Sequence, residues 1–125
     1  MKPATNKSGV VLVVDDEPLI RMNAADMLAD AGWTAIEAAD ADEALELLHA
    51  HPEVTVLFTD INMPGSIDGL DLARRVHDLR PDVHLVITSG KLRPGRDELP
   101  GAGRFIGKPY HERQFIALIE AVSAG

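Results

Sequence analysis

The chain has 125 residues, 46% of them hydrophobic, no cysteine and a formal net charge of −8. This length suits one domain with a buried core. The acidic balance argues against binding to nucleic acids or anionic membranes, because both are polyanions that attract clustered lysine and arginine. The lack of cysteine excludes disulfides, thiol catalysis and thiolate zinc sites. No apolar run approaches a membrane span and residues 1–9 lack the apolar stretch of a secretory signal, so we expect a cytoplasmic protein.

Five stretches predict strands. Val10–Val14, Val54–Thr59 and Val83–Thr88 are continuous apolar runs rich in β-branched residues, which is typical of parallel strands buried on both faces. Thr34–Ala38 is more mixed and Arg104–Gly107 is shorter, so both suit edge strands. A sheet order of 2-1-3-4-5 places the three apolar strands at the centre.

Segments with a helical period lie between the strands. Apolar residues recur three or four positions apart over Ile20–Ala31, Ala41–Leu48, Leu72–Leu79 and Phe115–Val122. Pro18 suits the first turn of the first helix, and Asp40 followed by Glu43 predicts a capping box ahead of the second. This alternation of strands and helices predicts a doubly wound α/β fold with right-handed crossovers.

The fourth helix of such a fold is expected to be reduced. Five glycines and prolines between residues 91 and 103 leave room for about one helical turn at 96–99. We expect a disordered segment at 1–9, a folded domain over 10–122 and a short tail at 123–125.

Charged residues follow the strands at one edge of the predicted sheet. Asp15 and Asp16 follow the first strand, Asp60 the third and Lys108 the fifth. Ligands of open parallel sheets bind at this edge, where the winding reverses between the first and third strands. Three carboxylates beside one lysine leave an excess of negative charge that a divalent cation would neutralise. Oxygen ligands favour Mg²⁺, which leaves a position open for a phosphate oxygen, so Asp60 is a candidate to accept a phosphoryl group.

Four segments in this order resemble the receiver domain of two-component response regulators: VVDDEP, LFTDINMPGSIDG, ITSG and FIGKP. The resemblance runs from Val10 to Val122, and the longer MPGSIDG loop is similar to receivers of hybrid sensor kinases. It implies a flavodoxin-like (βα)5 fold and a phosphoacceptor that works as a single-domain response regulator in a phosphorelay. The phosphoryl donor would be a phosphohistidine of a histidine kinase or a histidine phosphotransfer protein.

The resemblance also implies roles for residues of the acidic site. Asp60 would be the phosphoacceptor. Asp15, Asp16 and Asp60 would hold Mg²⁺ together with the backbone carbonyl of Asn62. Lys108 would pair with Asp60 and then with a phosphoryl oxygen.

A hydroxyl and an aromatic residue would transmit the change. In the family that this chain resembles, a small residue follows the switch hydroxyl, so the resemblance implies Ser89, which Gly90 follows, and Thr88 is the weaker candidate. Phe105, three residues before Lys108, holds the position of the switch aromatic in the receivers that this chain resembles. Three residues are expected to be structural, two in the loop after the phosphoacceptor and one in a cis Lys-Pro bond: Pro64, Gly69 and Pro109.

Other functions stay open at this point. An unphosphorylated pseudo-receiver that only binds proteins is disfavoured by the complete set of aspartates and lysine. A Mg²⁺-dependent phosphatase of the haloacid dehalogenase type needs a D-x-D motif, which the sequence Asp15-Asp16-Glu17 does not match. Flavin binding would need a Ser/Thr-rich phosphate loop after the first strand, which is absent from the sequence. We therefore expect a protein that is not an enzyme, apart from self-catalysed phosphorylation and dephosphorylation.

The expected partners are proteins. Besides the phosphoryl donor, we expect a downstream protein target, no nucleic acid and no membrane, and a monomer. Residues 91–103 are predicted to select the partner and to become more ordered on phosphorylation.

Overall fold

The computed structural model describes residues 9–65, 67–91, 93–95 and 98–124. Their core is one parallel sheet of five strands: β1 (Val10–Val14), β2 (Thr34–Ala38), β3 (Val54–Asp60), β4 (His84–Ser89) and β5 (Arg104–Gly107). The strands lie in the order β2-β1-β3-β4-β5, which confirms the predicted fold class and topology.

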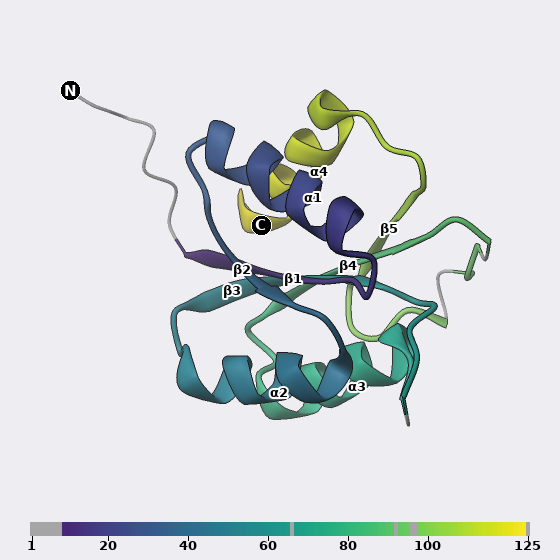
Figure 1. Ribbon diagram of the computed structural model, residues 1–125. Helices are drawn as coiled ribbons and strands as arrows, with labels where there is room; N and C mark the ends of the chain where they lie inside the picture. The colour runs from purple at the N-terminus through teal and green to yellow at the C-terminus, as the bar shows by residue number, and fades with distance from the viewer. Residues whose placement is uncertain (1–8, 66, 92, 96–97, 125) are drawn as a thin grey trace.

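Four α-helices cover the sheet within the described residues: α1 (Pro18–Asp30), α2 (Ala41–Ala50), α3 (Gly69–Leu79) and α4 (Glu112–Ala124). The helices α1 and α4 lie on one face, and α2 and α3 lie on the other (Figure 1). Alternate residues of β1 therefore point to two different core layers. Leu12 packs in the layer of α2 and α3, whereas Val11 and Val13 pack in the layer of α1 and α4.

The register brings the carboxyl ends of the inner strands to the same edge. Val14 of β1 pairs with Thr59 of β3, and Asp60 pairs with Thr88 of β4. Ser89 in turn pairs with Gly107 of β5, one residue before Lys108. Because the strands are parallel, the polar residues that end them face one region of the surface.

The start of α2 contains the predicted capping interactions. The Asp40 carboxylate accepts a hydrogen bond of 2.8 Å from the Glu43 N–H. The Glu43 carboxylate reaches one residue further back than in the standard capping box and accepts from the Ala39 N–H at 2.7 Å. Both contacts satisfy donors at a helix end that have no partner within the helix.

The described residues between β4 and β5 contain no α-helix, as the sequence predicted. A hydrogen bond of 3.0 Å from the Glu98 N–H to the Gly95 carbonyl closes a turn there. Residues 96 and 97, part of the turn expected at 96–99, lie outside the described residues.

The chain ends differ in part from the expectation. The tail expected at 123–125 is shorter, since Ser123 and Ala124 belong to α4. Gly125 lies outside the described residues, as do residues 1–8 of the disordered segment expected at 1–9. No helix among the described residues is both long enough and apolar enough to cross a bilayer.

Candidate functional site

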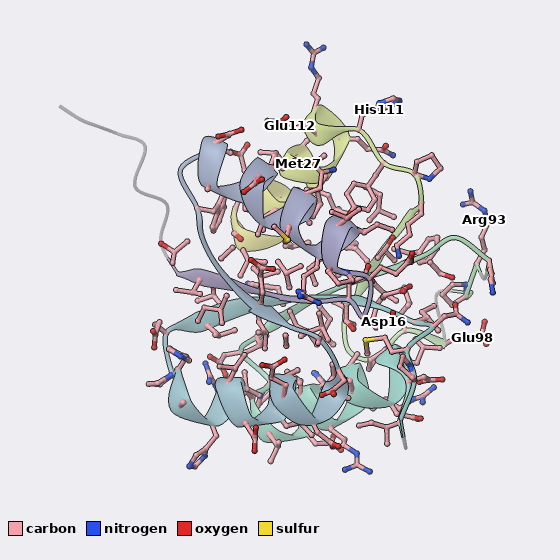
Figure 2. All side chains as sticks on the ribbon, in the orientation of Figure 1. Asp16, Met27, Arg93, Glu98, His111 and Glu112 are labelled. Atoms are coloured by element: carbon pink, nitrogen blue, oxygen red, sulfur yellow. The ribbon has the colours of Figure 1, made fainter. Side chains whose placement is uncertain are left out.

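Three aspartates form an acidic cluster at the carboxyl edge of the sheet. Asp15 and Asp16 lie between β1 and α1, Asp60 ends β3, and carboxylate oxygens of the three lie within 4.8 Å of one another. Asp15 and Asp60 are each only 4% exposed. Asp16 is more exposed, and Figure 2 labels it near the turn where β1 passes into α1. The structure thus brings together the carboxylates that the sequence placed at one edge.

Lys108 lies between the carboxylates of β1 and β3. Its Nζ is 3.0 Å from Asp15 Oδ2 and 3.2 Å from Asp60 Oδ2. Glu17 Oε2 lies at 3.9 Å from the same nitrogen. The Lys108 N–H donates to the Ser89 carbonyl at 3.0 Å, and the bond from Lys108 to Pro109 is cis, as the sequence predicted.

The electrostatics of the cluster favour an added cation. Burial raises the pKa of the Asp60 carboxyl, Lys108 opposes this increase and the charge of Asp15 adds to it. Burial also acts to lower the pKa of Lys108, but the hydrogen bond to Asp15 and the charge of Asp60 outweigh it and raise that pKa. Lys108 therefore stays charged at neutral pH while the carboxylates around it remain in excess.

The donor set fits a hard divalent cation. All three side chains offer carboxylate oxygens, which Mg²⁺ prefers. Among the described residues no group is hydrogen-bonded to the Asp16 carboxylate, so it can accept a ligand without breaking a bond. The Asn62 carbonyl, two residues after Asp60, stays a predicted ligand.

The two candidate switch hydroxyls have different surroundings. The Ser89 hydroxyl donates to Asn62 Oδ1 at 3.1 Å and accepts from the Lys91 N–H at 3.1 Å. Thr88 is buried, and its hydroxyl has no hydrogen-bond partner among the described residues. Ser89 thus contacts the segment that follows Asp60, and we keep it as the predicted switch hydroxyl.

Phe105 lies half-buried on β5 against the core layer of α2 and α3. The guanidinium carbon of Arg93 lies 5.9 Å from the centre of its ring. Arg93 belongs to the segment between β4 and β5 and extends outward (Figure 2). The switching role of Phe105 stays a prediction.

Gly69 and Pro64 lie in the connection from Asp60 to α3. A Cβ atom at position 69 would overlap the carbonyl oxygen of Asp60, so the close approach of the two backbones requires glycine. Pro64 is exposed in the loop, and its structural role stays a prediction.

Three further residues lie around the cluster: Glu17, which follows the two aspartates in the sequence, and Arg21 and Tyr110, to which the sequence did not point. The Glu17 N–H donates to Asp15 Oδ1 at 2.9 Å. Arg21 donates to the Asp15 carbonyl. Burial, with the charges of Asp15 and Asp60, raises the pKa of Tyr110 to about 12.

An open hollow of about 680 Å³ borders the cluster at Lys108. It is lined by residues from α1 and from the loops after β4 and β5: Leu19, Ile20, Asn23, Gly90, Lys108, Pro109 and Tyr110. Leu19 is 81% exposed. Met22, on the same helix, is also exposed, so α1 presents two large apolar side chains to solvent.

Comparisons with known proteins agree with this geometry. A family model described as the response regulator receiver domain matches residues 11–120. The sensor kinase CckA of Brucella abortus is 32% identical over 96% of this chain, which spans 13% of that kinase. The response regulator receiver protein CpdR of the same organism is 31% identical, over 88% of this chain and 92% of CpdR.

A solved structure shows the same architecture. The chemotaxis protein CheY4 of Vibrio cholerae superposes with a TM-score of 0.82 and 25% identity, over 93% of this chain and 99% of that one. Several other curated relatives are longer, and the chain spans about half of their length or less.

Proposed function

Since the chain belongs to the response regulator receiver domain family, we propose that it is a phosphoacceptor of two-component signalling with Asp60 as the acceptor. The observation that carries the proposal is the cluster of Asp15, Asp16 and Asp60, in which Asp15 and Asp60 pair with the Lys108 ammonium. Such a set can bind a divalent cation and a phosphoryl group at the same edge of the sheet.

Phosphoryl transfer would begin at a carboxylate oxygen of Asp60. This oxygen attacks the phosphorus of a phosphohistidine, a P–O bond forms, the P–N bond breaks and the leaving imidazole takes a proton. When bound to Asp15, Asp16, Asp60 and the Asn62 carbonyl, Mg²⁺ supplies positive charge that neutralises the phosphoryl oxygens. Lys108 moves from the Asp60 carboxylate to a phosphoryl oxygen and holds it by a charge-assisted hydrogen bond.

The switch would then act through Ser89. To donate to the new phosphoryl group, the Ser89 hydroxyl must give up its hydrogen bond to Asn62. Phe105 turns inward into the space that this movement opens. Residues 91–103 follow Ser89 after the single residue Gly90, and we expect them to become more ordered in response.

The phosphoryl donor would be a histidine kinase or a histidine phosphotransfer protein. Leu19, which lines the hollow at Lys108, and Met22 are two exposed apolar residues of α1 that support a protein contact close to Asp60. The similarity to CpdR, a response regulator receiver protein, supports action on a downstream protein. A monomeric state and a cytoplasmic location are parts of the same proposal.

Two alternatives are kept as outcomes of the test. A pseudo-receiver would take no phosphoryl group, and an aspartyl-phosphate phosphatase would turn over an external phosphomonoester. We propose neither, and expect no chemistry on external substrates beyond the uptake and loss of the phosphoryl group on Asp60.

The test is the intact mass of the protein after incubation with Mg²⁺ and acetyl phosphate. We expect one added phosphoryl group, lost in Asp60→Asn and lost when the metal is chelated. Asp78→Asn, an exposed aspartate on α3, is a matched control and should gain the same mass as the original chain.

Beryllofluoride binding gives a second readout. Absence of both the mass adduct and beryllofluoride binding would overturn the proposal and favour the pseudo-receiver. Steady release of phosphate from a phosphomonoester would favour the phosphatase instead.

A further inference from the structure

Arg21 links the start of α1 to the acidic cluster. The residue before this helix, Glu17, makes no side-chain capping hydrogen bond, and Pro18 occupies the first turn. Arg21 reaches back from the same turn and donates a hydrogen bond of 2.9 Å from its Nη1 to the carbonyl of Asp15. Its side chain is only 17% exposed, so the contact is shielded from solvent.

The other side of the guanidinium is held by β2. Arg21 Nε donates to Glu37 Oε1 at 3.1 Å. A guanidinium is planar and rigid, so two contacts on different nitrogens set its orientation. Arg21 thereby joins three elements at the carboxyl edge of the sheet: α1, β2 and the end of β1.

The acceptor of Arg21 is the carbonyl of the peptide that joins Asp15 to Asp16. The Asp15 N–H donates to the Ala38 carbonyl at 3.2 Å, and the Glu17 N–H donates to Asp15 Oδ1 at 2.9 Å. Arg21 adds the contact that sets the plane of the following peptide. The direction of the Asp16 side chain depends on that plane, because no hydrogen bond within the described residues holds its carboxylate.

We propose that Arg21 is a positioning residue of the acidic site, which orients the Asp15–Asp16 peptide so that the Asp16 carboxylate is ready for Mg²⁺. The inference rests on the proposed function, since it assigns the cation to this cluster. Groups that orient metal ligands without touching the metal typically change its affinity by about 10- to 100-fold when they are removed.

When Arg21 is replaced, the loss of its charge and the loss of its positioning contact are expected to change the affinity for Mg²⁺ in opposite directions. Loss of a positive charge beside three carboxylates would by itself strengthen the attraction for a divalent cation. Loss of a positioning contact weakens binding, because Asp16 must then be ordered by the cation itself. The sign of the change in affinity therefore separates the two effects.

The experiment measures the dissociation constant for Mg²⁺ by isothermal titration calorimetry on the whole chain. Arg21→Met keeps an unbranched apolar stem and removes the donors of the guanidinium, and we expect the dissociation constant for Mg²⁺ to rise about 10-fold. Arg21→Lys can contact the Asp15 carbonyl or Glu37 but not both. Its dissociation constant for Mg²⁺ should therefore lie between those of the original chain and Arg21→Met.

Arg74→Met provides a matched control. Arg74 is an exposed residue of α3 that pairs with Asp71 at 3.0 Å, and its replacement changes the net charge by the same amount. The dissociation constant for Mg²⁺ should stay the same as in the original chain.

Urea unfolding without Mg²⁺, followed by the fluorescence of the single tryptophan, Trp33, shows which variants are folded. If Arg21→Met does not fold, Arg21→Lys and Glu37→Gln test the same contact. A folded Arg21 variant that binds Mg²⁺ as tightly as the original chain, or more tightly, overturns the inference.

Failure of the proposed function looks different. In that case the original chain binds no Mg²⁺ and gains no phosphoryl group at Asp60. The inference is supported if the original chain and Arg74→Met bind Mg²⁺ equally well and Arg21→Met binds it more weakly. This holds whatever the phosphoryl assay shows.

Discussion

At the scale of single residues, Gly69 has the least room for a side chain near Asp60. Its N–H donates to the Ile61 carbonyl at 2.9 Å, which pulls the first turn of α3 onto the end of β3. The atom that a Cβ would overlap is a backbone oxygen, which cannot rotate away as a flexible side chain can. The sequence predicted a structural glycine in this loop, and the close approach of the two backbones is the physical reason for it.

Gly69→Ala should therefore lower the free energy of unfolding by about 2 kcal/mol or more, since backbone shifts are needed to fit the methyl group. Urea unfolding followed by Trp33 fluorescence measures the change. Gly90→Ala is the control, because the nearest atom to its Cβ would be Lys108 Cβ at an ordinary 3.8 Å. Equal stability of the two variants would contradict the close approach.

Tyr110 offers a prediction on pH, because it is the only tyrosine of the chain and its ionisation is visible in the ultraviolet absorbance. Burial and the charges of Asp15 and Asp60 raise its pKa to about 12 in the folded protein. In the unfolded chain the pKa is about 10. Between these values the folded state keeps a proton that the unfolded state has lost, so the contribution to stability decreases as pH rises.

We expect an absorbance midpoint near 12 for the folded protein and near 10 in denaturant. In Asp60→Asn the pKa of Tyr110 should fall but stay above 10, because burial is the larger cause. An absorbance midpoint near 10 in a protein that Trp33 fluorescence shows to be folded would contradict the burial of Tyr110.

At the scale of elements, the sequence predicted every strand to within one residue at each end. The differences lie in β3, which continues into Asp60, and in β4, which begins one residue later, at His84, and continues into Ser89. Hydrophobic patterning cannot detect these ends, because the last residues of the strands are polar and belong to the site. Asp60 and Ser89 belong to their strands because they pair with residues of the neighbouring strands, and this pairing depends on the tertiary fold.

The same distinction explains what was missed in the site. Asp15, Asp16, Asp60 and Lys108 could be predicted because each directly follows a recognisable strand. Arg21 could not, since its role depends on contacts with Asp15 and with Glu37, 16 positions away. No local pattern specifies such a contact.

The helix α1 carries a prediction about partner binding. Leu19→Ser should slow phosphoryl transfer from a histidine kinase severalfold while leaving phosphorylation by acetyl phosphate unchanged, because only the protein donor needs the apolar contact. Stability should change little, as Leu19 is 81% exposed. Leu79→Ser, at the end of α3 and 66% exposed, is the matched control and should affect neither reaction. Equal slowing with both donors would place the defect in the Asp60 site and not in docking.

At the scale of the whole molecule, Mg²⁺ should stabilise the fold, because the cluster joins β1 to β3 and exists only in the folded chain. At 100 times the dissociation constant, the gain in free energy of unfolding is about 2.7 kcal/mol. Urea unfolding with and without Mg²⁺ measures it, against sodium chloride at equal ionic strength. Asp16→Asn should lose most of the gain, whereas Asp26→Asn, an exposed residue on α1, should keep it. Equal stabilisation by both salts would mean that no specific site contributes.

The two outer strands have a consequence for aggregation. An exposed strand edge can pair with another chain, and short or charged edges discourage this. β5 has only four residues and begins with the exposed Arg104, while the other edge, β2, carries Glu37 in an ion pair with Arg21. The contact that orients the acidic site therefore also keeps a charged side chain on an open edge of the sheet, where it opposes the addition of a foreign strand.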